Sequence, residues 1–138
     1  MTTPEDMAAR RAKIVLAADD QPENLMMLES LIEAQGFTFF GVESGLDVLS
    51  LAPRINPRLI LLDVQMPLMD GFETCRRLRE IHELKPVPIA FLTARKSSDD
   101  VRAGLMAGGN DFMVKPFDPD KIMTRIVQWT SRRLPGGV

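Results

Sequence analysis

The chain has 138 residues, a length typical of one domain with a hydrophobic core. Its hydrophobic content of 45% and charged content of 26% are ordinary for a globular protein, and its formal net charge of −2 gives no general attraction to nucleic acid or anionic membranes. No apolar run approaches the roughly 20 residues that span a bilayer, and residues 1–11 lack the apolar stretch of a signal peptide. Because Cys75 is the only cysteine, an internal disulfide is excluded, and we expect a cytoplasmic protein.

Five short apolar segments alternate with helical patterns along the chain. The segments that fit strands buried on both faces are 13–18, 37–42, 58–64, 89–92 and 111–114. Capping residues, acidic residues and first-turn prolines mark the helix starts, and these starts lie near Pro22, Ser44, Phe72, Ser98 and Pro119. The second helix is expected to end at Pro53. This alternation predicts an α/β fold with a parallel sheet, right-handed crossovers and helices on both faces.

Four of the predicted strands end at a charged or hydroxyl residue. Asp19 and Asp20 follow the first strand, Asp63 lies at the end of the third, Thr93 follows the fourth, and Lys115 follows the fifth. Ligands of open parallel sheets bind at the carboxyl ends of the strands, so we expect these side chains to converge. Three carboxylates repel one another unless a cation lies among them, and oxygen ligands favour Mg²⁺. A hydroxyl and an ammonium group complement a phosphoryl group.

Each of these residues also has a simpler interpretation. Asp19 and Asp20 could cap the helix that follows them, Thr93 could be an ordinary strand residue, and Lys115 could be a solvated lysine before a turn. Their occurrence together at equivalent strand ends favours the site. The chain has no GxGxxG or GxxxxGK[ST] motif, so the sequence predicts neither a dinucleotide site nor a P-loop.

Two basic groups, Arg76-Arg77-Arg79 and Arg132-Arg133, are interpreted as solvated helix faces. They lack interleaved aromatic residues, and no helix-turn-helix pattern follows them. We therefore expect this chain to bind neither nucleic acid nor a membrane.

Four motifs in order, AADDQPENL, LLDVQMPLMDG, FLTA and DFMVKPF, resemble the receiver domain of bacterial response regulators in two-component systems. The resemblance covers about residues 12–131. It implies a flavodoxin-like, doubly wound sheet of five parallel strands in the order 2-1-3-4-5, with five helices. The receiver domain would span residues 13–131, with an N-terminal tail at 1–12 and a C-terminal tail or the start of a linker at 132–138.

The resemblance also implies a role for each residue of the acidic cluster. It places phosphorylation on Asp63. It assigns Mg²⁺ to Asp63, to Asp20 directly and to Asp19 through water, with the backbone carbonyl of Gln65 completing the metal ligands.

Further roles are implied at the other strand ends. Thr93 and Lys115 would contact the phosphoryl group, and the Lys115-Pro116 bond is expected to be cis. Thr93 and Phe112 would form a switch in which the ring turns inward on phosphorylation. Phe112 stands where the family often has tyrosine, so the ring has no hydroxyl to offer a partner. Gln65 and Arg95 would tune the lifetime of the acyl phosphate, in a direction that the sequence does not give.

The family's phosphodonor is a phosphohistidine on a sensor histidine kinase or a histidine phosphotransfer protein. His82, the only histidine, is expected on or after the third helix and away from the site, so this chain would be the acceptor. Phosphorylation would alter the face formed by residues 98–107, 111–115 and 118–131 and so regulate an unknown downstream protein or output domain. The sequence leaves open whether the receiver stands alone or belongs to a longer regulator.

Two other functions compete with this interpretation. A haloacid-dehalogenase-type phosphohydrolase also uses an aspartyl phosphate, but it has a DxD motif, whereas this chain reads Asp63-Val64-Gln65 and lacks a cap domain. A degenerate receiver could act as a protein-binding module without phosphorylation, but all five site residues are present.

Overall fold

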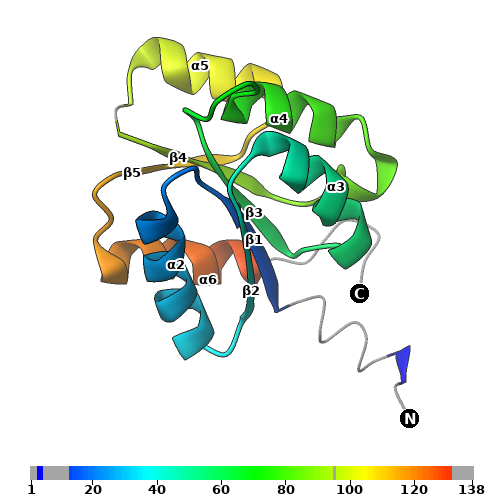
Figure 1. Cartoon of the computed structure of the whole chain (residues 1–138), viewed down its shortest axis with the longest axis vertical. Coiled ribbons are helices and arrows are strands. Elements are labelled where there is room, and N and C mark those ends of the chain that lie inside the picture. Colours follow the sequence, from blue (N-terminus) through cyan, green and yellow to red (C-terminus); the bar gives the residue numbers. More distant parts are fainter. Residues whose placement is uncertain (1–2, 5–12, 95, 132–138) are drawn as a thin grey trace.

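The computed structural model describes residues 3–4, 13–94 and 96–131 and shows a parallel sheet of five strands (Figure 1). The strands are β1 (Ile14–Ala18), β2 (Thr38–Val42), β3 (Leu59–Asp63), β4 (Ile89–Thr93) and β5 (Asp111–Val114). Their order in the sheet is β2-β1-β3-β4-β5, and every neighbouring pair is parallel. The predicted topology is therefore confirmed.

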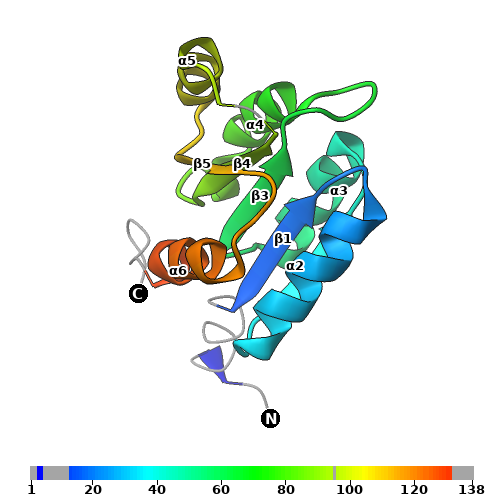
Figure 2. The same ribbon diagram turned by 90° about the vertical axis from the view of Figure 1, so that its left-hand side faces the viewer.

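The described residues form five α-helices and one short 3-10 helix. The helices are α2 (Pro22–Ala34), α3 (Gly45–Ile55), α4 (Gly71–Arg79), η1 (His82–Leu84), α5 (Ser98–Ala107) and α6 (Pro119–Thr130). One hydrophobic core lies between the sheet and α3, α4 and α5, and a second lies between the sheet and α2 and α6. Figures 1 and 2 show these two helical layers on opposite faces of the sheet.

Burial explains the apolar runs of the sequence. All five residues of the central strand β3 are buried, and so are all five of β4. The edge strand β2 has only half-buried and exposed residues. The most continuous apolar runs therefore belong to strands that helices cover on both faces, as such runs predict.

Helix α3 continues past Pro53, so the expected helix end at this proline is wrong. The helix runs to Ile55 and ends at Asn56, which has a left-handed φ of 49° and donates its N–H to the carbonyl of Ala52 at 2.9 Å. A proline this close to the end removes one N–H donor, and only the carbonyl of Leu49 loses its helical partner. The left-handed conformation of Asn56, and not Pro53, therefore ends the helix.

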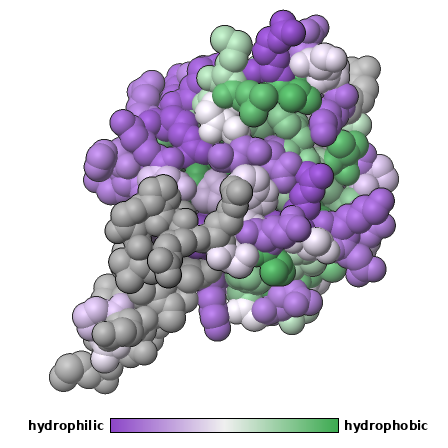
Figure 3. Space-filling view, turned by 180° about the vertical axis from the view of Figure 1, so that it is seen from behind, coloured by the Kyte–Doolittle hydropathy of each residue, from purple (hydrophilic) through white to green (hydrophobic). Residues whose placement is uncertain are grey.

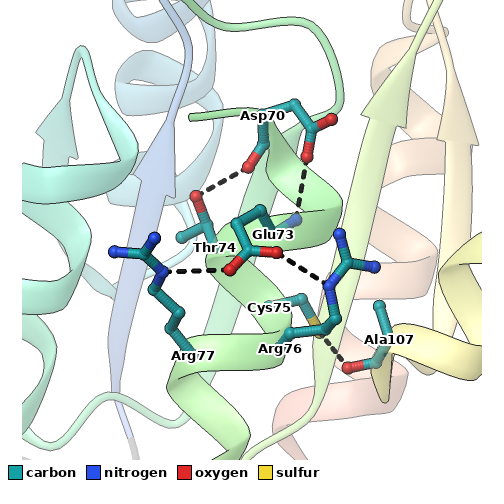
Figure 4. A network of polar contacts seen from close by, with 7 residues as sticks. All are labelled: Asp70, Glu73, Thr74, Cys75, Arg76, Arg77 and Ala107. Carbon is teal, nitrogen blue, oxygen red and sulfur yellow. Dashed lines mark hydrogen bonds and ion pairs between the residues drawn. The ribbon is translucent and has the colours of Figure 1, made fainter. Parts of the chain in front are cut away.

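Helix α4 begins one residue before the expected start because Asp70 caps it (Figure 4). The carboxylate of Asp70 accepts the N–H of Glu73 at 2.8 Å. Glu73 then lies between the guanidinium groups of Arg76 and Arg77, at 2.9 and 3.0 Å. Both arginine side chains are about half exposed, so they lie on a solvated helix face as predicted.

Arg79 differs from these two arginines, and its interpretation as part of a solvated face is wrong. Its Nε donates to the carbonyl of Gly108 and its Nη2 to Oδ1 of Asn110, both at 2.9 Å. Its Nη1 lies 2.7–3.1 Å from three further carbonyl oxygens, those of Leu84, Lys85 and Val87. The guanidinium therefore joins the end of α4 to η1 and to the turn between α5 and β5.

The surface is mainly polar on the face that Figure 3 shows, where hydrophobic residues gather in small separate groups. Among the described residues, no helix is both long enough and apolar enough to cross a membrane.

Replacing Arg79 by alanine tests whether its hydrogen bonds to η1 and to the turn between α5 and β5 stabilise the fold. We expect Arg79→Ala to lower the free energy of unfolding by about 2–4 kcal/mol, because several backbone carbonyls lose their donor. Arg76→Ala on the exposed face of the same helix is the matched control, and it should change stability little because exposed ion pairs contribute little. Urea unfolding followed by circular dichroism measures both variants, and equal losses would contradict the role of Arg79.

Candidate functional site

The register of the sheet brings the polar strand ends to one edge. Ala18 at the end of β1 pairs with Leu62, so the next residues on these two strands are Asp19 and Asp63. Farther along the same edge, the N–H of Lys115 donates to the carbonyl of Thr93 at 2.7 Å. The expected convergence of residues from β1, β3, β4 and β5 is therefore present in the fold.

Three carboxylates form a cluster at this edge. Asp19 and Asp63 are buried, at 0% and 5% exposure, and Asp20 is exposed. Each residue offers a carboxylate oxygen, and these oxygens lie within 4.8 Å of one another. A set of hard oxygen donors with one exposed member fits Mg²⁺, which binds a few carboxylates and keeps several waters.

Asp19 is held firmly by its neighbours. Its Oδ2 accepts from Lys115 Nζ at 2.8 Å and from Asn24 Nδ2 at 3.1 Å, while its Oδ1 accepts the N–H of Gln21 at 2.9 Å. The N-cap of α2 is Gln21, without a side-chain capping bond, so neither aspartate occupies the capping position that the simpler interpretation requires. Asn24 was not singled out in the sequence, although its place in the first turn of α2, five residues after Asp19, brings it to this edge.

Asp63 makes longer contacts than Asp19. Its Oδ1 lies 3.3 Å from Lys115 Nζ and 3.4 Å from the N–H of Gln65. Burial raises the pKa of Asp63 to about 6, with a further increase from the charge of Asp19 and an opposing effect from Lys115. A carboxylate that is buried beside a like charge and loosely hydrogen-bonded keeps lone pairs available for a cation or an electrophile.

Lys115 is the basic centre of the cluster. Burial acts to lower its pKa, but the hydrogen bond and charge of Asp19, followed by those of Asp63, outweigh burial, and the pKa is raised above its ordinary value. The ammonium group therefore stays charged between the two buried aspartates. The Lys115-Pro116 bond is cis, which confirms that expectation.

The loop between β3 and α4 closes tightly against the strand end. The N–H of Gly71 donates to the carbonyl of Val64 at 2.9 Å. A Cβ at position 71 would overlap the carbonyl oxygen of Asp63, so only glycine allows this approach. A groove of about 540 Å³ lies beside the loop, and its lining residues include Asp20, Val64, Met66, Pro67 and Phe72.

The two residues of the expected switch are both buried. Thr93 is 8% exposed and Phe112 is 7% exposed, and the ring of Phe112 lies 5.2 Å from that of Phe91. A Cβ at Gly104 on α5 would overlap the ring of Phe112, so this glycine makes room for the inward ring. Sequence reasoning missed Gly104, because a glycine within a helix gives no sign of the side chain that packs on it. Arg95 lies outside the described residues.

A pocket of the size that holds a ligand also lies along β5 and α6, with a volume of about 760 Å³. Lys115 lines it, together with Phe112 and Ile122, but none of the three clustered aspartates does. The acidic cluster and this pocket therefore share Lys115 and are otherwise separate.

Known proteins share this sequence pattern and fold. Residues 15–127 match the sequence model of the response regulator receiver domain. The chain is 32% identical over 134 residues to the sensor histidine kinase GacS of Pseudomonas protegens, covering 95% of this chain and 15% of GacS. It is 34% identical over 120 residues to the response regulator PleD of Caulobacter vibrioides, covering 87% of this chain and 26% of PleD.

A solved structure agrees with these sequence matches. The receiver domain of the sensor histidine kinase PA1611 from Pseudomonas aeruginosa, which holds a magnesium ion in its active-site cleft, superimposes with a TM-score of 0.80 at 28% identity. The match covers 87% of this chain and 98% of that domain. The chain thus spans a small part of the two longer relatives and nearly the whole of this single domain. On the matched residues, the strand order and the acidic edge of the sheet, the chain belongs to the receiver domain family of two-component response regulators.

Proposed function

We propose that Asp63 accepts a phosphoryl group from a phosphohistidine of a sensor histidine kinase or a histidine phosphotransfer protein. The observation that carries the proposal is the group of three carboxylates and one ammonium at the carboxyl edge of the sheet. Asp19, Asp20, Asp63 and the backbone carbonyl of Gln65 would hold Mg²⁺. When bound, the ion would neutralise charge on the carboxylates and on the phosphoryl oxygens.

The chain's own residues supply position and charge. A carboxylate oxygen of Asp63 attacks phosphorus, the bond from phosphorus to the imidazole nitrogen breaks, and that nitrogen keeps the electron pair. Lys115, 3.3 Å from Asp63, stabilises the charge on the transferred phosphoryl oxygens. The hydroxyl of Thr93 donates a hydrogen bond to one of these oxygens. Such a transfer needs alignment and charge stabilisation more than acid–base chemistry.

The product is an acyl phosphate that water hydrolyses later. Gln65 is exposed beside Asp63, where its amide would contact the attacking water or the phosphoryl group. Arg95 would shield the site. The proposal gives these two residues the role of setting the lifetime of the phosphorylated state.

Phosphorylation would reach the surface through Thr93 and Phe112. The ring of Phe112 is already inward in the structure, and movement of the Thr93 hydroxyl toward the phosphoryl group would hold the ring in that position. Phe112 packs on α5 at Gly104 and lines the pocket along β5 and α6. The face of α5, β5 and α6 would therefore carry the output to a downstream protein or domain.

The same proposal covers the partners and the bounds of the chain's domain. GacS and PleD are named as a sensor histidine kinase and a response regulator, which supports a histidine kinase as phosphodonor.

Residues 13–131 would form the receiver, with 132–138 as a tail or the start of a linker. The chain would act in the cytoplasm, where ATP charges such kinases. The phosphohydrolase alternative gains no support, because the matched family is that of receivers.

Phosphorylation by a small donor tests the acceptor directly. With Mg²⁺ and acetyl phosphate, we expect the wild-type protein to gain one phosphoryl group in intact-mass spectrometry. Asp63→Asn should gain none, and Asp99→Asn, which alters an exposed aspartate at the start of α5, should behave as wild type. If the wild type neither gains mass nor binds beryllofluoride, the proposal fails, and a binding module that works without phosphorylation replaces it.

Metal binding tests the part of the site nearest to solvent. Asp20→Asn is expected to weaken Mg²⁺ binding about tenfold, because the ion loses one charged ligand. The exposed Asp20 makes no contribution to the buried core, so the fold should be retained. Isothermal titration calorimetry measures the affinity, with Glu23→Gln in the first turn of α2 as the control acid. Equal affinities of the two variants would remove Asp20 from the metal site.

The pKa of Asp63 predicts how stability depends on pH without metal. The pKa rises from 3.8 to about 6 on folding, so protonated Asp63 favours the folded state, and this contribution is lost as the pH rises through 6. Asp63→Asn should therefore unfold with a free energy about 1–3 kcal/mol higher than wild type near neutral pH. The difference should shrink below about pH 4. Urea titrations in metal-free buffer measure it, and a difference that does not vary with pH would contradict the raised pKa.

A further inference from the structure

Leu68 is exposed in a way that the fold does not explain. It is the most exposed large hydrophobic residue of the described chain, at 100%. Its φ of 72° lies in the left-handed region, which residues with a Cβ rarely adopt. Glycine or asparagine would suit this backbone better, and neither would expose an apolar side chain to water. The fold therefore gains nothing from leucine at this position.

Hydrogen bonds and a buried side chain nevertheless fix the loop that carries Leu68. The next residue, Met69, is buried at 8% exposure and donates its N–H to the carbonyl of Pro67 at 2.8 Å. The bond from Gly71 to Val64 closes the loop, and Asp70 caps α4 directly after it. The contacts that fix the loop are therefore made by Met69, Asp70 and Gly71, and the side chain of Leu68 extends from the loop into solvent.

The loop places Leu68 close to Asp63. Gly71 lies against the carbonyl of Asp63, and three residues of chain from Gly71 reach at most about 11 Å. A small transient protein interface covers roughly 600 Å² on each partner, which is a patch of about 14 Å radius. A protein that brings a phosphohistidine to Asp63 would therefore meet the loop that carries Leu68, whereas a small phosphodonor would not need to touch Leu68.

The approach to Asp63 runs along the same loop. Asp63 is only 5% exposed, and helical layers cover both faces of β3, so the carboxyl edge of the sheet is the way in. The groove of about 540 Å³ at this edge joins Asp20 to the apolar side chains of Val64, Met66, Pro67 and Phe72. An apolar partner surface can rest on this loop while its phosphorylated histidine reaches the acidic cluster.

We propose that Leu68 is a docking contact for the protein that donates the phosphoryl group, an inference that rests on the proposed function of Asp63. The leucine side chain inserts into an apolar depression of the partner that carries the phosphohistidine. Leu68 contributes to the encounter between the two proteins and takes no part in the chemistry at Asp63. Its effect therefore depends on the size of the phosphodonor.

Two donors of different size separate docking from chemistry. The variants are Leu68→Asn and Leu68→Gly, both compatible with a left-handed φ, and the control is Leu46→Gln, which removes an apolar side chain of 58% exposure from α3. The small donor is acetyl phosphate. The protein donors are autophosphorylated histidine kinases from the organism that encodes this chain, assayed one at a time against the wild type to find one that transfers.

Both Leu68 variants are expected to match the wild-type rate with acetyl phosphate within about twofold. Their kcat/KM for transfer from the kinase should fall about tenfold, the effect typical of losing one buried apolar contact. Leu46→Gln should be unchanged with both donors. Equal losses with both donors, or no loss with the kinase, would overturn the proposal.

Failure of the proposed function would look different. If acetyl phosphate phosphorylates the wild type but no kinase does, Leu68 has no protein donor to contact, and only this inference is overturned. If neither acetyl phosphate nor any kinase phosphorylates the wild type, the role of Asp63 is overturned, and the inference falls with it.

Discussion

The ion pairs of Lys115 with Asp19 and Asp63 are the contacts on which the site depends. Two buried carboxylates repel each other, and the ammonium group at 2.8 and 3.3 Å from them makes their proximity tolerable. With the exposed Asp20, three carboxylates and one ammonium leave two negative charges, which a divalent cation would neutralise. The site is therefore compact enough to fold and negative enough to hold Mg²⁺.

The parallel sheet turns distant positions in the sequence into one surface. Asp19, Asp63 and Lys115 are far apart along the chain, but each lies at or directly after the carboxyl end of a strand, and the register brings those ends together. The same strands extend away from the site into the core. Phe112 on β5 lies against Gly104 on α5, so the strand that leads to Lys115 packs directly on that helix.

The sequence predicted most of the fold and the meeting of Asp19, Asp20, Asp63 and Lys115 at one edge, because strand burial and strand-end chemistry leave strong local patterns. It failed where a tertiary contact decides the outcome. Pro53 marked a helix end, but the left-handed cap at Asn56 placed that end two residues later. Arg79 reads like its neighbours Arg76 and Arg77, and only the fold shows the carbonyl groups that surround it. Leu68 gave no signal either, since its exposure and φ exist only in the folded loop.

Chemical trapping of the phosphorylated residue tests the central claim most directly. An acyl phosphate on an aspartate is reduced by borohydride to homoserine, which peptide mass spectrometry locates in the sequence. After phosphorylation in the presence of Mg²⁺, the assignment predicts homoserine at position 63 and at no other aspartate. Homoserine at Asp19 or Asp20, or no homoserine in a protein that has gained a phosphoryl group, would contradict it.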